Sequence, residues 1–141
     1  MQPGYGQYEN DPLHNMTEHG EGSVGITSGG TNRYAKAGGS FSYTMEVDPE
    51  GTSLLVTFKT TDVGKSIEIL AGGMSVFKEV LIGEGEVEYY DVLIPLSKEV
   101  LQKAYGRFYN CRDRLVLDFV FQGIDGAESA AVCQFIYTLQ A

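Results

Sequence analysis

Carboxylates are the most numerous groups in this sequence that could do chemistry, with 19 acidic residues among 141. Two carboxylates flanking a cleft could hydrolyse a glycosidic bond. Most acids from position 46 onward, however, occupy polar positions of predicted strands or turns, where solvated surface is their ordinary role: Glu46, Asp62, Glu68, Glu84, Glu86, Glu88 and Asp91. Asp118 alternates with Leu, Val and Phe in one strand and is interpreted as a structural partner of Arg112, Arg114 or a polar group on a neighbouring strand. No carboxylate pair is predicted to be catalytic.

Metal-binding and nucleophilic motifs are weakly represented. His14 and His19 lie five residues apart, but no CxxC or HExxH spacing accompanies them, so no zinc site is predicted. A structural Ca²⁺ is an open alternative, with oxygen ligands from acids near the N-terminus: Glu9, Asp11, Glu18 and Glu21. The sequence has no Ser-His-Asp elbow, no GxGxxG after a strand and no P-loop. We therefore predict no catalytic residue, no metal-ligating residue and no cofactor.

Tyrosine side chains offer a second kind of chemistry, because sugars stack on exposed aromatic faces beside groups that bond their hydroxyls. Tyr34, Tyr89 and Tyr90 are the candidate sugar-binding residues, with Tyr105 and Tyr109 as further exposed rings to consider. Tyr89 and Tyr90 are adjacent, so one of them must face outward from a strand. The alternative is that these rings cover a partner domain or the edge of the fold. The absence of Trp, the strongest stacking ring, favours this alternative.

Charge and hydropathy exclude several classes of partner. The formal net charge is −9, opposite in sign to that of a nucleic-acid-binding domain, and it also disfavours an anionic membrane surface. No apolar run approaches the ~20 residues that span a bilayer. The first residues, MQPGYGQYENDPLHNM, lack the basic start, apolar stretch and cleavage site of a signal peptide. We therefore expect no nucleic acid or membrane partner and a cytoplasmic location.

Period-2 alternation begins at Phe41 and predicts strands over 41–47 and 53–60, joined by the turn Asp48-Pro49-Glu50-Gly51 as a hairpin. A second hairpin is predicted from 66–70 and 74–82 around Ala71-Gly72-Gly73, and a further strand from 86–94. Ser97 is suited to cap a short helix over 98–104. Before Phe41 the segment from His14 to Gly39 is expected to be ordered loop with at most one short strand near 23–27.

The chain ends in two predicted strands, 114–121 and 131–139, taken as a hairpin about the turn near Asp125. In that register Cys133 faces Phe119 and lies about eight residues, ~26 Å, from Cys111, too far for a disulfide. Both thiols are therefore expected to be free, with Cys133 buried. This favours a reducing compartment.

These seven or eight short strands, with no alternation between strands and helices, predict an all-β fold. The predicted fold is a two-sheet antiparallel β-sandwich, jelly-roll-like, with one short helix. Residues 1–13 are interpreted as a linker or domain edge and residues 14–141 as a single domain. Apolar residues on both faces of some strands, such as Val116 and Val120 opposite Leu115, predict a partner domain or loop over the outer face.

The order of several short motifs resembles the C-terminal β-sandwich of the bacterial β-L-arabinofuranosidase-like proteins, glycoside hydrolase family 127 and its relatives. The similar segments are Pro3-Gly4, Glu9 and His14, then Ser23 and Gly25, NRYA at 32–35, GGSFSY at 38–43, LVTF at 55–58 with Asp62, Gly64 and Lys65, Ile69-Leu70 with the glycines after them, Tyr90 with Ile94-Pro95, and the final strands. Asn32 and Ser40 stand where the family has Trp, and Lys59 replaces another aromatic residue.

The resemblance implies an accessory domain, since the family's catalytic cysteine, zinc and glutamate lie in a separate helical barrel. No position of this chain matches those catalytic residues. The expected function is therefore non-catalytic packing against the catalytic domain of a parent glycoside hydrolase or against a partner subunit, with Arg33 as a structural anchor. The alternative is a carbohydrate-binding module that uses exposed tyrosines. A free-standing enzyme is a third interpretation, and would require a concave pocket with convergent carboxylates or histidines.

Overall fold

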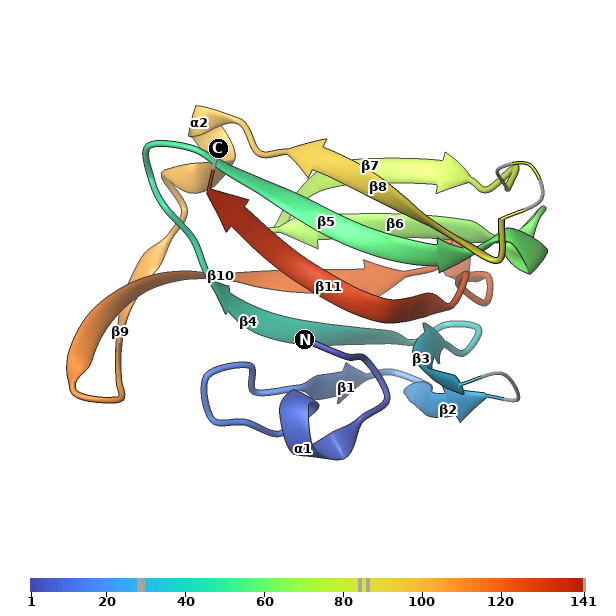
Figure 1. The fold of residues 1–141 in the computed structure, drawn as a ribbon, viewed down its shortest axis with the longest axis horizontal. Coiled ribbons are helices and arrows are strands. Elements are labelled where there is room, and N and C mark those ends of the chain that lie inside the picture. Colours follow the sequence, from blue (N-terminus) through green and yellow to red (C-terminus); the bar gives the residue numbers. More distant parts are fainter. Residues whose placement is uncertain (28–29, 84, 86, 141) are drawn as a thin grey trace.

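The structure is a computed structural model that describes residues 1–27, 30–83, 85 and 87–140, except for the side chains of 26–27, 30–31 and 133–135. Two antiparallel sheets pack face to face as a β-sandwich (Figure 1). The first sheet has the order β1-β4-β10-β6-β7, with β9 paired to β10, and the second has the order β2-β3-β11-β5-β8. The predicted two-sheet antiparallel sandwich is confirmed.

The strands of the first sheet are β1 (Thr17–His19), β4 (Ser40–Glu46), β6 (Ser66–Ala71), β7 (Met74–Val80), β9 (Tyr105–Tyr109) and β10 (Arg112–Gln122). Those of the second are β2 (Ser23–Thr27), β3 (Gly30–Ala35), β5 (Thr52–Lys59), β8 (Tyr89–Pro95) and β11 (Val132–Gln140). Short helical turns are α1 (Gly6–Glu9), η1 (Thr60–Asp62), α2 (Lys98–Leu101) and η2 (Ile124–Gly126). No helix in the described part is both long and apolar enough to cross a membrane.

Alternating apolar side chains of both sheets form the core. From the first sheet these are Phe41, Tyr43, Met45, Ile67, Ile69, Leu117, Phe119 and Phe121, and from the second Ala35, Leu54, Val56, Phe58, Val132 and Ile136. The rings of Phe41 and Phe121 stack with centroids 5.2 Å apart. In β4, β5, β6 and β10 buried apolar positions recur with period 2, so one face of each of these strands points inward.

Two predicted hairpins are wrong. β4 and β5 do not pair: β4 belongs to the first sheet and β5 to the second, so the turn at 48–51 carries the chain across the sandwich. Likewise β10 pairs with β4, β6 and β9, whereas β11 pairs with β3 and β5. Cys133 therefore lies opposite Asn32 rather than Phe119. Cys111 is free and exposed, as expected, while the side chain of Cys133 lies outside the described ones.

Three other predictions can be compared with the structure. The hairpin of β6 and β7 is confirmed, and so is the helix at 98, where the hydroxyl of Ser97 accepts from the backbone N–H of Val100. The region before Phe41 was expected to hold at most one short strand, but it contains β1, β2 and β3. These strands are short and polar, so they carry no alternation that a sequence pattern could reveal.

Candidate functional site

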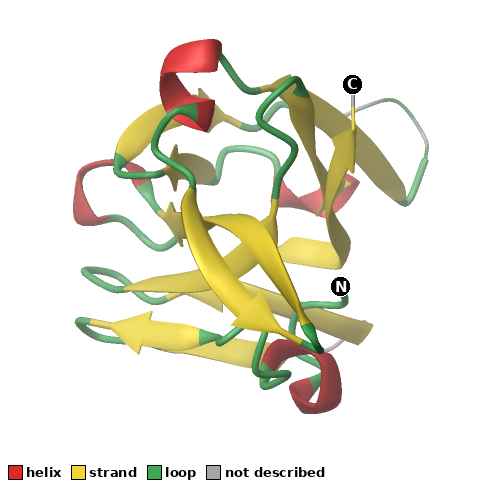
Figure 2. Ribbon diagram, turned by 90° about the vertical axis from the view of Figure 1, so that its left-hand side faces the viewer, coloured by secondary structure: helices red, strands yellow, loops and turns green. Residues whose placement is uncertain are grey.

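A hairpin projects from one end of the sandwich, beside the crossing from β4 to β5 (Figure 1). It consists of β9 and the first residues of β10, and Figure 2 views it from that end. Asn110 and Cys111 form its two-residue turn, with φ of 51° and 66°. Two consecutive positive φ values are the mark of the type I′ turn, whose twist matches that of the paired strands.

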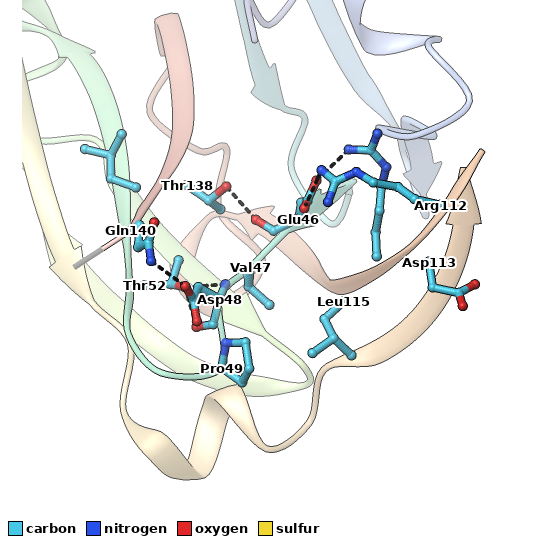
Figure 3. Close-up of a pocket in the computed structure, with 12 residues that line it drawn as sticks. Glu46, Val47, Asp48, Pro49, Thr52, Arg112, Asp113, Leu115, Thr138 and Gln140 are labelled. Carbon is cyan, nitrogen blue, oxygen red and sulfur yellow. Dashed lines mark hydrogen bonds and ion pairs between the residues drawn. The ribbon is translucent and has the colours of Figure 1, made fainter. Parts of the chain in front are cut away.

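A groove of about 610 Å³ opens between this hairpin and the end of the second sheet (Figure 3). It is lined by the end of β4 and the turn after it, the start of β10 and the end of β11: Glu46, Val47, Asp48, Pro49, Thr52, Arg112, Asp113, Arg114, Leu115, Thr138, Leu139 and Gln140. Such a volume falls in the range of small-molecule and oligomeric ligand sites. The groove combines charged and amide side chains with exposed aliphatic ones.

The charged side of the groove is organised around Glu46. Arg114 Nη1 donates to its carboxylate at 2.7 Å and Arg112 Nη2 donates at 3.1 Å. The side chain of Arg112 is 59% exposed and that of Arg114 only 14%. Arg114 also donates through Nε to the Tyr109 carbonyl at 3.0 Å and lies over the Tyr109 ring. Arg114 is therefore fixed in place, whereas Arg112 can reach a ligand.

The opposite wall is the turn after β4 and the end of β11. The backbone N–H of Asp48 donates to the hydroxyl of Thr52, which in turn donates to the Asp48 carbonyl, both at 2.8 Å. Gln140 Nε2 donates to Asp48 Oδ2 at 2.6 Å, and Thr138 Oγ1 donates to the Glu46 carbonyl at 2.6 Å. Four hydrogen bonds hold this wall together, and the Oε1 atom of the exposed Gln140 amide keeps its capacity to accept.

The hairpin rests on the N-terminal segment. Arg107 donates to the carbonyls of Pro12 and Leu13, and the hydroxyl of Tyr109 donates to Asp11 Oδ1 at 2.9 Å. The hydrogen bond from the Leu13 backbone N–H is the largest influence on Asp11 and, helped by Tyr109, holds the pKa of its carboxyl below the usual value against the opposing effect of burial. The segment predicted to be a linker or domain edge thus supports one wall of the groove.

A buried cluster ties that segment to the sandwich. Arg33, the predicted structural anchor, lies on β3 and donates to both oxygens of Glu9, through Nε at 2.7 Å and Nη2 at 2.8 Å. The hydroxyl of Tyr43 also donates to Glu9, and Arg33 Nη1 donates to the hydroxyl of Ser23 at 2.6 Å. The Glu9 residue is only 1% exposed. Sequence reasoning missed Glu9 in this role, because a polar residue outside any periodic run gives no sign of burial.

Electrostatics in this cluster favour the ionised pair. Burial is the largest influence on Glu9 and would raise the pKa of its carboxyl, but hydrogen bonds from Arg33, Tyr43 and the Gly4 N–H, with the charge of Arg33, hold that pKa below its usual value. Burial, followed by the charge of Glu9, raises the pKa of Tyr43 well above its usual value. Glu9 is therefore a carboxylate at neutral pH.

The predicted tyrosines do not come together. Tyr34 lies on β3, with Lys65 Nζ 5.9 Å from its ring centroid, whereas Tyr89 and Tyr90 lie on β8, and β11 and β5 separate the two strands. Tyr90 packs toward the core, with its ring centroid 6.1 Å from that of Phe58. Tyr89 takes the outward position, opposite Lys59. None of the three lines the groove.

Three of the acids considered as Ca²⁺ ligands are engaged by separate protein partners. Glu9 is engaged by Arg33 and Tyr43, Asp11 by Leu13 and Tyr109, and Glu18 accepts from the Ser23 N–H at 2.9 Å. Among the described residues, no three His, Cys, Asp or Glu side chains are grouped so that they could hold a metal ion.

Asp118 accepts from Thr44 and Tyr105 on the outer face of the first sheet.

Comparison with known proteins gives a fold relationship. No family model matches the chain, and no curated protein sequence matches it. A solved structure that does match is a family 35 carbohydrate binding module from Clostridium thermocellum, with a TM-score of 0.54 and 11% identity over 90% of this chain and 93% of that one. At this identity the match shows a shared β-sandwich fold. It gives no support to the resemblance to glycoside hydrolase family 127.

Proposed function

We propose that this chain is a non-catalytic carbohydrate-binding domain and that the groove beside the β9–β10 hairpin is its ligand site. One observation carries the proposal: on a sandwich of the fold found in a carbohydrate-binding module, the groove places exposed polar groups next to exposed aliphatic ones. Sugars present both hydroxyl groups and apolar C–H faces, and a site of this mixed kind complements both. This reverses the order of the two functions expected from the sequence.

Three side chains are suited to bond sugar hydroxyls. Arg112 is exposed and keeps donors in reserve beyond its contacts with Glu46. Asp113 is exposed, and within the described part of the chain its carboxylate has no bonding partner. Gln140 has an acceptor oxygen that is not used in its bond to Asp48. Of the three carboxylates that line the groove, Glu46 is paired with Arg112 and Arg114 and Asp48 accepts from Gln140, so we propose binding rather than hydrolysis.

A glycan microarray followed by calorimetric titration tests this proposal. We expect the folded protein to bind at least one glycan, and Asp113→Ala and Arg112→Ala to weaken that binding about tenfold, which is 1.4 kcal/mol. Glu79→Ala is the matched control, because Glu79 is an exposed strand carboxylate outside the groove. If no glycan binds, or the three variants bind equally, the groove is not a carbohydrate site.

A second candidate function, packing against the catalytic domain of a parent glycoside hydrolase, has its own support. Leu93 of β8, Leu55 of β5 and Tyr137 of β11 lie side by side across the second sheet. Leu93 is 55% exposed and Tyr137 40%, so these three side chains form an apolar patch on the outer face of the second sheet. If a domain covers it, Leu93→Lys will abolish co-elution with the parent's catalytic domain and leave glycan binding intact. Unchanged co-elution would count against this interface.

A further inference from the structure

The β9–β10 hairpin extends the inner face of the first sheet beyond the point where the second sheet ends. Leu115, Leu117 and Phe119 alternate on one face of β10. Leu117 and Phe119 are completely buried beneath the second sheet, but Leu115 is 40% exposed. Phe108 on β9 lies opposite Asp113 and is 70% exposed. The hairpin therefore carries core-type side chains with no sheet to cover them.

This uncovered face forms a strip that joins the groove. The strip consists of Phe108, Asp113, Gly106 and Leu115, since Phe108 pairs with Asp113 and Gly106 with Leu115. A side chain at Gly106 would have no neighbour within 4 Å, so the strip is open there. Asp113 and Leu115 also line the groove. A ligand in the groove can thus continue along the strip to the ring of Phe108.

The chemistry of the strip selects the class of occupant. An apolar protein surface laid on Phe108 and Leu115 would also bury Asp113, and an unpaired buried carboxylate is costly. A sugar avoids this cost, because its C–H face stacks on the ring while its hydroxyls donate to the carboxylate. Aromatic ring, carboxylate and open glycine together therefore favour a polyol over a peptide or a second copy of this chain.

Charge favours a neutral sugar over an acidic one. Three carboxylates line the groove but only two guanidinium groups do, and both guanidinium groups already donate to the Glu46 carboxylate. Asp113, which has no partner among the described residues, lies where the strip and the groove meet. The whole chain carries a net charge of −9, which adds long-range repulsion of anions. Because Asp113 and Leu115 belong to both the groove and the strip, the two form one elongated site that suits an oligosaccharide better than a single sugar.

We propose that the domain binds a neutral oligosaccharide that runs from the groove along the hairpin, with one sugar ring stacked on Phe108. The inference rests on the proposed function and adds the ligand class, the direction of the chain and a residue that determines its length preference. Phe108 was not among the aromatic residues considered from the sequence, because its exposure depends on where the second sheet ends.

Titration with graded oligosaccharides tests the inference. The probes are neutral xylo-, cello-, manno- and arabino-oligosaccharides of one to six units, with galacturonic acid oligomers of the same lengths. We expect affinity for a neutral series to rise with length, and Phe108→Ala to remove about tenfold of the affinity for long members while leaving that for the monosaccharide unchanged. Ile82→Ala is the matched control, since Ile82 is a surface apolar residue, 87% exposed, outside both groove and strip.

Failure of this inference can be told apart from failure of the proposed function. Neutral binding that depends on Asp113 but neither increases with length nor changes in Phe108→Ala would overturn the extended path and keep the groove. Tighter binding of the galacturonic acid oligomers than of every neutral series would overturn the neutral class alone. Absence of binding to any of the probes and to the microarray would overturn both.

Discussion

Replacing Glu9 by Gln tests whether the buried cluster holds the N-terminal segment on the sandwich. The change keeps the shape of the side chain but removes the charge that faces Arg33, whose side chain is only 9% exposed. Losing one partner of a buried pair costs about 3–5 kcal/mol. Arg33 retains Ser23 and, at 3.5 Å, the partly exposed Glu18, so we expect the lower end, about 3 kcal/mol.

That loss is large for a domain whose total stability is about 5–15 kcal/mol. For a chain of this length it corresponds to a fall in Tm of roughly 10 °C. Urea unfolding followed by circular dichroism measures the free energy of unfolding. Glu18→Gln is the control, because the Glu18 side chain is 42% exposed and 3.5 Å from Arg33, so its loss should cost under about 1 kcal/mol. Arg33→Met should lower the free energy of unfolding less in the Glu9→Gln background than in the wild-type protein. In the double variant no buried carboxylate is left without its partner.

The same residue gives a pH dependence with a definite sign. The pKa of Glu9 is lower in the folded protein than its usual 4.5, so the unfolded chain binds the proton more readily. Its contribution to stability is therefore complete above about pH 4.5 and disappears as the pH falls through the lower folded value. Glu9→Gln should lose this part of the acid sensitivity. A loss of stability below about 1 kcal/mol, or an unchanged acid profile, would refute the reasoning.

Two further substitutions test the hairpin turn and the role of Tyr90. Cys111→Gly should raise stability by about 0.5 kcal/mol, because glycine accepts the positive φ of 66° that the turn after Asn110 imposes; a fall in Tm would show that the turn does not need this conformation. Tyr90→Ala should cost about 2 kcal/mol through lost packing on Phe58 and leave glycan affinity unchanged, so a stable variant with lost binding would return Tyr90 to the ligand site.

Alternation in the sequence was a sound guide to strands and a poor guide to their partners. Phe41 to Val47 and Ser66 to Leu70 have the period of half-buried strands, and both lie in the sheet with their apolar side chains inward. The turn after Val47 has the residues of a reversal, but reversal chemistry does not say whether the chain returns to the same sheet or crosses to the other. The hairpin predicted there failed for that reason.

The candidate site was less accessible from the sequence than the fold. The groove brings together the ends of β4, β10 and β11, which are far apart in the chain, and their meeting depends on the strand order that the sequence left open. The exposure of Phe108 depends on where the second sheet ends, which the sequence pattern does not reveal. Arg33 could be singled out as a guanidinium ahead of the core strand that begins at Phe41, whereas its partner Glu9 stands in a polar run with nothing to mark it as buried.

The residues that anchor the hairpin are different from those that it exposes to a ligand. This difference affects how the ligand site can change by mutation. Arg107, Tyr109 and Arg114 hold the hairpin through its other face and through backbone carbonyls. Gly106, Phe108 and Asp113 lie on the opposite face and are exposed. Substitutions at these three positions therefore cost little folding free energy. Mutation can explore new ligands there without risking the fold, while the residues beneath stay under constraint.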